Sequence, residues 1–141
     1  MRTRRSRGFT LIELMVVITI LGLLASITSV GVMKYLRQAK VERAMMDMRA
    51  IVDGIKHFRL RTGKIPSAIA DMCGPDEDTR DLDRTEPPKD PWGGDYVYTP
   101  KDRRTYELLC YGADGVEGGD GEDKDITLKD LENQGTTEQG K

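Results

Sequence analysis

Residues 7–13 read Arg7-Gly8-Phe9-Thr10-Leu11-Ile12-Glu13, and an uncharged run from Leu14 to Met33 follows them. At about 1.5 Å per residue in a helix, that run is roughly 30 Å long, the thickness of a bilayer's hydrocarbon core. Glu13 is the one charged residue between Phe9 and Met33. Because an unpaired carboxylate in hydrocarbon costs several kcal/mol, we expect Glu13 to be functional and to have a charged partner.

This N-terminal segment has three interpretations. A secretory signal peptide fits the arginines before Phe9, but its apolar core is usually about 7–15 residues and ends at an Ala-x-Ala-like site, which is absent here. A plain signal anchor fits the length, and the positive-inside rule would keep the arginines in the cytoplasm, but this interpretation leaves Glu13 unexplained. The third interpretation follows from the order of the residues.

Residues 7–26 resemble the prepilin signature of type IV pilins and type II secretion pseudopilins: a basic leader, Gly, Phe, a spacer, Glu and an apolar stretch. In that family a prepilin peptidase cuts after the glycine, which implies cleavage between Gly8 and Phe9 and N-methylation of Phe9. The resemblance also implies that Glu13 is an assembly charge that meets the Phe9 ammonium of a neighbouring subunit. Away from water this attraction is much stronger than in solution.

The apolar run continues into an amphipathic segment. Between Lys34 and Arg61, apolar residues recur every three or four positions, which indicates one buried helical stripe. The first proline of the chain is Pro66, and a glycine shortly before it, Gly63, is typical of a helix ending. We therefore predict a single helix of roughly 50 residues. The residues of the stripe are Val41, Ala44, Met45, Met48, Ile51, Val52, Ile55 and Phe58.

One position departs from the family pattern. Many relatives carry a helix-melting proline about two-thirds of the way along the membrane segment, where this chain has Val30 followed by Gly31. Glycine lowers helix propensity by about 1 kcal/mol but keeps its backbone donor. The sequence therefore leaves open whether, and how far, the helix melts locally near residues 28–31.

Beyond the helix the sequence predicts a small antiparallel sheet. Tyr96 and Tyr98 would share one face of a strand, and a second alternating run, 104–111, follows after a short link that favours a β-hairpin. The expected fold class is α+β: a long N-terminal helix packed against a small sheet, as in type IV pilin-like proteins. The expected parts are a leader (1–8), a transmembrane or filament-core helix (9–33), an amphipathic helix (34–63), a globular β head with an acidic loop (64–131) and a flexible tail (132–141).

A second resemblance lies in the head. Residues 90–96, Asp-Pro-Trp-Gly-Gly-Asp-Tyr, and the Gly- and acid-rich residues 112–126 look like the major pseudopilin of the type II secretion system, which ends in a calcium-binding loop. Oxygen ligands of this kind suit Ca²⁺, and the spacing does not fit an EF-hand. A solvated acidic run is the alternative. The resemblance implies side-chain ligands Asp114 and Asp125, then Asp123, with Glu122 or Asp120 as further candidates, and backbone carbonyls of Tyr111 and Val116.

Departures from that second pattern also occur. The family's Gly-Asn-Trp after the loop is replaced by Thr127-Leu128-Lys129.

The chain has two cysteines, Cys73 and Cys110, whose separation fits neither a redox Cys-x-x-Cys pair nor a zinc site. An oxidising periplasm would favour a disulfide between them, and two unpaired thiols are the alternative.

Charge is divided unevenly along the chain. Residues 1–70 carry a net charge of +9 and residues 71–141 one of −11. No aromatic residue is interleaved with the N-terminal arginines, so a nucleic-acid partner is not expected. An enzyme is not expected either, because the carboxylates lie in a Gly-rich loop with no histidine or nucleophile beside them in sequence.

The resemblance implies a structural subunit of a type II secretion pseudopilus, a helical filament that drives export across the outer membrane. A subunit of a type IV pilus or related surface filament is the alternative. The expected location is the bacterial inner membrane, crossed once, with the head in the periplasm. The implied partners are further copies of the chain, minor pseudopilins, the prepilin peptidase, an inner-membrane assembly platform with its ATPase, and membrane lipid.

Overall fold

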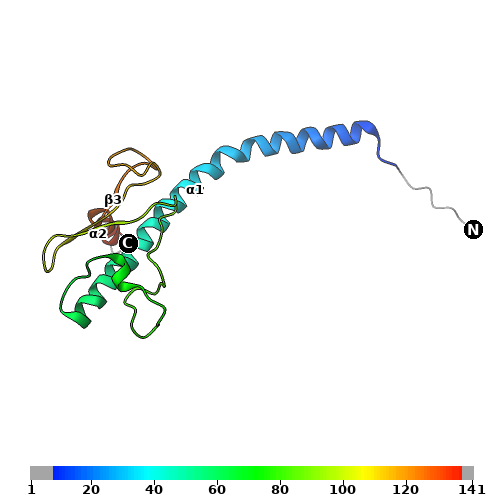
Figure 1. Ribbon diagram of the computed structural model, residues 1–141. Coiled ribbons are helices and arrows are strands. Elements are labelled where there is room, and N and C mark those ends of the chain that lie inside the picture. The colour runs from blue at the N-terminus through cyan, green and yellow to red at the C-terminus, as the bar shows by residue number, and fades with distance from the viewer. Residues whose placement is uncertain (1–7, 138–141) are drawn as a thin grey trace, which may run out of the picture. The chain divides into compact units, whose positions relative to one another are not determined.

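The computed structural model describes residues 8–137, and the side chains of residues 27–31 and 134–137 lie outside that description. Contacts group Arg37–Lys141 into one compact unit and Met1–Leu36 into another. A long helix and a small antiparallel sheet make up the predicted α+β class, which is confirmed. The elements are helix α1 (Leu11–Thr62), 3-10 helix η1 (Ile69–Met72), strands β1 (Val97–Pro100), β2 (Tyr106–Cys110) and β3 (Ile126–Thr127), and helix α2 (Leu128–Thr137) (Figure 1).

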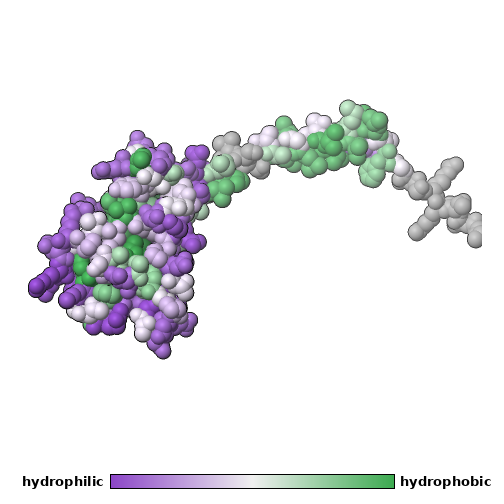
Figure 2. Space-filling view, viewed as in Figure 1, coloured by the Kyte–Doolittle hydropathy of each residue, from purple (hydrophilic) through white to green (hydrophobic). Residues whose placement is uncertain are grey.

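In the first unit, α1 exposes its apolar side chains. Leu11 is 77% exposed and Leu23 is 65% exposed. Figure 2 shows this portion of the chain as a hydrophobic surface. Among residues whose side chains are described, no helix is long and apolar enough to cross a membrane. The expected span 14–33 includes residues 27–31, whose side chains lie outside the description. The backbone there is helical within α1, so the structure shows no melting near Val30, which the sequence had left open.

In the second unit, α1 buries the predicted stripe. Met48, Ile51 and Ile55 are almost completely buried, and the remaining stripe residues are buried or pack against this core. Gly54 lies on the same side of the helix, and a Cβ there would lie 3.2 Å from the Asp81 carbonyl oxygen. The small residue therefore lets the loop after η1 approach the helix. The prediction of one core-facing stripe is confirmed.

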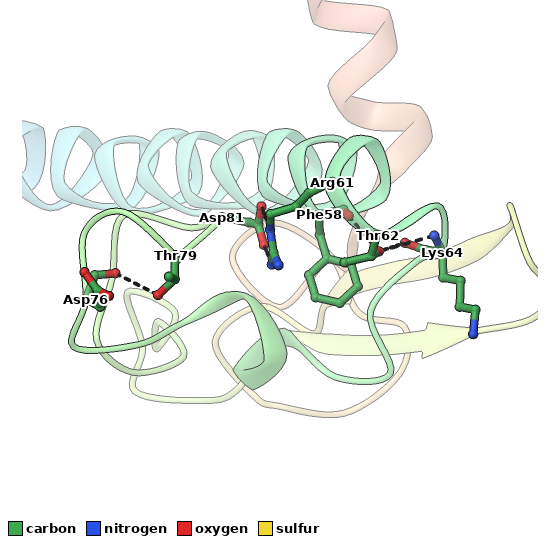
Figure 3. A network of polar contacts seen from close by, with 7 residues as sticks. All are labelled: Phe58, Arg61, Thr62, Lys64, Asp76, Thr79 and Asp81. Atoms are coloured by element: carbon green, nitrogen blue, oxygen red, sulfur yellow. Dashed lines mark hydrogen bonds and ion pairs between the residues drawn. The ribbon is translucent and has the colours of Figure 1, made fainter.

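The end of α1 is fixed by backbone geometry and by one ion pair. Gly63 has φ +75° and its N–H donates to the Arg59 carbonyl at 2.8 Å, which is a left-handed glycine cap. Arg61 lies over the Phe58 ring, 5.3 Å from its centroid, and forms an ion pair with Asp81 (Figure 3). The helix therefore ends where Gly63 and the following proline predict.

The sheet has the order β1-β2-β3 and is antiparallel throughout. Val97 pairs with Leu109, which pairs with Thr127 on the other side. Leu108 and Cys110 point into the core and are almost fully buried, as their alternation predicts. The predicted hairpin between β1 and β2 is confirmed.

A third strand and a second helix follow the acidic loop, and the sequence analysis did not predict them. Thr127 donates its N–H (2.9 Å) and its hydroxyl (2.7 Å) to Asp130 Oδ2, which caps the start of α2. Leu131 packs into the core and is 9% exposed. The tail expected to be flexible from Glu132 is therefore helical as far as Thr137.

Candidate functional site

Glu13 lies in the first turn of α1 and is bonded to Thr10. Its Oε2 accepts hydrogen bonds from the Thr10 N–H at 2.8 Å and from the Thr10 hydroxyl at 2.9 Å. Thr10 Oγ1 in turn accepts the Glu13 N–H at 3.3 Å. This reciprocal pattern is a capping box. The sequence analysis missed the role of Thr10, although Thr-x-x-Glu before an apolar run is the signal that identifies it.

The cap determines where the Glu13 carboxylate is held. It keeps the carboxylate at the N-terminal end of the helix, beside the residue that follows Phe9. Phe9 is exposed, and a Cβ built on Gly8 would meet no atom within 4 Å. The predicted cleavage bond and the predicted assembly charge therefore lie at one helix end. The preceding leader residues 1–7 lie outside the described residues.

The acidic loop, residues 111–125, connects two residues that pair directly, the last of β2 and the first of β3. Gly112 has φ +70° and Gly119 has φ +82°. A Cβ at Gly112 would lie 2.5 Å from the Glu122 carbonyl oxygen, and one at Gly119 would lie 2.5 Å from that of Asp123. These two glycines therefore allow the loop to fold back tightly on itself.

Two of the predicted calcium ligands already accept backbone hydrogen bonds inside this loop. Asp114 Oδ1 accepts the Val116 N–H at 3.2 Å, and Asp125 Oδ2 accepts the Gly118 N–H at 2.9 Å. The other oxygen, Asp125 Oδ1, is buried and has no hydrogen-bond partner within the described part of the chain. Burying a carboxylate oxygen without a partner costs free energy, so Asp125 Oδ1 is the loop atom that a bound cation would stabilise most.

The remaining candidates are placed differently. Asp123 and Asp120 are exposed, and Glu122 forms an ion pair with Arg37 at 3.1 Å. Tyr111 is half-buried at the start of the loop. Within the described residues, no three His, Cys, Asp or Glu side chains form a group that could hold a metal. The structure thus does not bring the predicted side-chain ligands together, and calcium binding stays a prediction.

The two cysteines are free, so the expected disulfide is not formed. The Cys73 thiol follows η1 and donates to the Ile69 carbonyl at 3.5 Å. The Cys110 thiol is buried in β2 and donates to Asp90 Oδ2 at 3.8 Å. Burial raises the pKa of Cys110 to about 11. The two thiols thus contact different groups, the Ile69 carbonyl and the Asp90 carboxylate.

Asp90 holds the segment 90–96, which carries the second resemblance, in a tight turn. Its Oδ1 accepts the N–H groups of Trp92 at 2.9 Å and Gly94 at 2.8 Å, and the side chain is buried. This is an Asx-type turn, in which a short carboxylate satisfies the backbone of the residues after it. The motif therefore builds the turn that leads into β1.

These features define a class of protein. An exposed apolar helix start carrying one capped carboxylate, in a chain whose head is a helix packed with a three-stranded sheet, is the arrangement of type IV pilin-like subunits.

Comparison with known proteins identifies the family within that class. The model for "Type II secretion system (T2SS), protein G" matches residues 31–129, and the prokaryotic N-terminal methylation motif matches residues 3–29. A relative from Pseudomonas aeruginosa named type II secretion system core protein G is 37% identical over 89% of this chain and 96% of its own length. Relatives with the same name from Vibrio cholerae and Escherichia coli are 34% and 31% identical, over 89% and 82% of this chain and 92% and 88% of their own lengths.

The chain belongs to the type II secretion system protein G family, the major pseudopilins. Both resemblances stated from the sequence, the prepilin signature and the major pseudopilin pattern, are thereby confirmed.

Proposed function

We propose that this chain is a structural subunit that assembles with copies of itself into a helical pseudopilus, whose growth moves secreted proteins across the outer membrane. The observation that carries the proposal is the exposed apolar surface of α1 around a single capped carboxylate. Apolar surface on this scale is costly in water, so it needs lipid or other helices around it. We therefore propose a structural role.

Before assembly, the same apolar segment would anchor the subunit in the inner membrane in a single pass. The arginines of the leader would remain in the cytoplasm, and the head would lie in the periplasm. The methylation motif at residues 3–29 supports cleavage by the prepilin peptidase between Gly8 and Phe9 and methylation of Phe9. The partners we propose are the minor pseudopilins, the inner-membrane assembly platform and its ATPase.

Within the filament, Glu13 would pair with the Phe9 ammonium of a neighbouring subunit. The cap holds the carboxylate at the helix end where such an amine would arrive. Pairing removes the cost of an isolated charge in an apolar core, and a wrongly placed neighbour would leave the charge unpaired. The pair would therefore set the register between subunits.

We further propose that the acidic loop binds Ca²⁺. The unpartnered buried Oδ1 of Asp125 supports this, as does a donor set made only of oxygens. Asp114, Asp123 and Asp125 would supply side-chain oxygens, and Tyr111 and Val116 would supply backbone carbonyls. The cation would neutralise a loop that is otherwise self-repelling and so order the head.

The test of the filament proposal is direct. The full chain is expressed with a type II secretion machinery, and filaments sheared from the cells are examined by electron microscopy and mass spectrometry. We expect filaments built from a chain that begins at methylated Phe9. A chain that stays in the membrane fraction as a monomer, with no filament under any expression level, would refute the proposal.

A further inference from the structure

Two exposed apolar side chains of the head, Leu60 and Val116, have neighbours of opposite charge. In the described part of Arg37–Lys141, the large hydrophobic side chains that are exposed are Met46, Leu60 and Val116, at 63%, 86% and 58%. A single exposed apolar residue is ordinary on a protein surface. Met46 has neighbours of both signs, whereas Leu60 is surrounded by cations and Val116 by anions.

The Leu60 patch consists of Lys56, Arg59, Leu60 and Lys64. Lys56 lies one turn before Leu60 on the same face of α1, and Lys64 extends from the end of the helix (Figure 3). All four residues are exposed. Lys56 pairs with Asp53 at 2.8 Å, and the other two cations have no ion-pair partner among the described residues. The patch is therefore an apolar centre with cations available around it.

The Val116 patch consists of Val116, Glu117 and Asp120 at the tip of the acidic loop. All three are exposed, and neither acid forms an ion pair with any described residue. This patch has an apolar centre with anions around it. The Leu60 and Val116 patches are thus complementary in charge and alike in having an apolar centre.

The two patches lie at opposite ends of the head. Glu122, in the acidic loop, pairs with Arg37 at 3.1 Å, which places the loop beside the first turn of the head's portion of α1. From Arg37 to Leu60 the helix advances about 34 Å at 1.5 Å per residue. Figure 1 shows the orange loop beside the cyan part of α1, with the green end of the helix at the far side of the head. One copy therefore cannot join its own two patches.

We propose that the Leu60 patch of one copy docks onto the Val116 patch of the next copy. Different surfaces on the two partners make this a heterologous contact, which propagates into an open fibre rather than closing as a dimer. The apolar side chains would cover each other, and the charges around them would select the partner and its orientation. The inference rests on the proposed function, since it names the contact by which heads of one filament stack.

Cysteine cross-linking in the full chain tests this contact. A Cys73→Ser background removes the half-exposed native thiol, while Cys110 is buried. With Leu60→Cys and Val116→Cys in one chain, mild oxidation of cells expressing the secretion machinery should give a ladder of multimers on non-reducing gels. The matched control pairs Met46→Cys with Val116→Cys and should give no ladder.

The outcomes separate this inference from the proposed function. Filaments that form normally without a Leu60–Val116 ladder, or an equal ladder from the Met46 control, would overturn the docking contact and leave the pseudopilin assignment intact. Absence of filaments from the parent chain would overturn the proposed function and this contact with it.

Charge exchange supplies an independent readout. Arg59→Glu in the cross-linking chain should abolish the ladder, and adding Glu117→Arg should restore it. Arg104→Glu makes the same change of charge at an exposed position of the β1–β2 connection and should leave the ladder unchanged. A double variant no better than Arg59→Glu alone would overturn the proposed charge pairing.

Discussion

The Glu13 carboxylate accepts two hydrogen bonds from Thr10, and it uses only one of its two oxygens to do so. Glu13 Oε2 accepts both the Thr10 N–H and the Thr10 hydroxyl, whereas Oε1 has no hydrogen bond within the described part of the chain. Helix capping and charge pairing are therefore compatible, because capping leaves one oxygen available to a neighbour's ammonium. The two roles can be separated by mutation.

Glu13→Gln keeps an acceptor for the Thr10 groups but removes the charge. We expect normal membrane insertion and leader cleavage, with filament formation sharply reduced, because the Phe9 ammonium of the neighbour loses its partner. The measurement is the amount of sheared filament relative to mature protein in the membrane.

Thr10→Val is the matched variant, since it removes the hydroxyl from the cap and keeps the Glu13 charge. Loss of a cap costs about 1 kcal/mol. We expect filaments to form close to the parent level, because packing of α1 in the filament can compensate for a loss of that size. If Glu13→Gln assembles as well as the parent while Thr10→Val does not, the carboxylate acts as a cap alone.

Leader processing gives a second prediction. Gly8→Val should leave the leader attached, and membrane-extracted protein should then begin at Met1 in mass spectrometry. In the structure a Cβ at Gly8 meets nothing within 4 Å, so the folded chain itself would tolerate the change. If cleavage of Gly8→Val is blocked, the cause is therefore the peptidase's requirement for glycine and not misfolding of the chain. Normal cleavage of Gly8→Val, or a parent chain cut near Ala25, would contradict the prepilin interpretation.

Much of the fold could be predicted because its signals are periodic. The stripe from Val41 to Phe58 repeats every three or four residues, and the alternation in 104–111 repeats every two, so each pattern specifies both an element and its buried face. The ending at Gly63 could be predicted because few residues adopt a positive φ. These signals are local, and tertiary contacts did not overrule them.

The parts that were missed depend on short signals or on distant contacts. Both helix starts are set by signals four residues long, a capping box at Thr10–Glu13 and an Asp130 cap on Thr127, which were overlooked beside the longer patterns. Helix α2 is short, and among its described side chains Leu131 is buried and Leu128 packs partly against the core, so few apolar positions mark it in the sequence. The Cys110 thiol contacts Asp90, twenty residues earlier, whereas the Cys73 thiol contacts the Ile69 carbonyl of the adjoining η1, and the spacing of the two cysteines specifies neither contact.

Calcium should raise the melting temperature of the full chain in detergent. At a concentration about a hundredfold above Kd, binding adds about 2.7 kcal/mol, which corresponds to several degrees for a head of this size. Mg²⁺ should do much less, since it dehydrates reluctantly and requires octahedral geometry. Asp125→Ala should abolish the shift, because it removes the unpartnered buried oxygen.

Two controls accompany this measurement. Asp114→Ala should also abolish the calcium shift, whereas Glu86→Ala, at an exposed acid outside the loop, should leave it unchanged. Melting curves of the parent that superimpose in EGTA and in added calcium would mean that the loop is a solvated acidic run.

Acid should loosen α2 before the rest of the head. Although burial opposes it, hydrogen bonds from Thr127 and the nearby Lys124 lower the pKa of Asp130 below its ordinary 3.8. A lowered pKa means that the cap contributes stability above that value and that the contribution is lost as pH falls through the folded-state pKa. The hydrogen-exchange protection of α2 amides should therefore fall as the pH drops below 3.8, earlier than that of α1. Asp130→Asn should make α2 exchange independent of this titration, and an unchanged profile would contradict the cap.

The thiols give the last prediction, which tests the absence of the disulfide. Burial raises the pKa of both, to about 11 for Cys110, so both are protonated at neutral pH and react slowly. Cys73 is half-exposed and Cys110 is buried, so a maleimide should label Cys73 first and Cys110 only after unfolding. Cys73→Ser should remove the early labelling, and Cys110→Ser should remove only the late labelling. The measurement is the intact mass of unreduced protein, extracted from cells in which the head has been exported to the periplasmic side of the membrane. A chain that takes up no label even when unfolded, and takes up two after reduction, would show that the cysteines are bridged and that the free thiols of this structure are not the exported state.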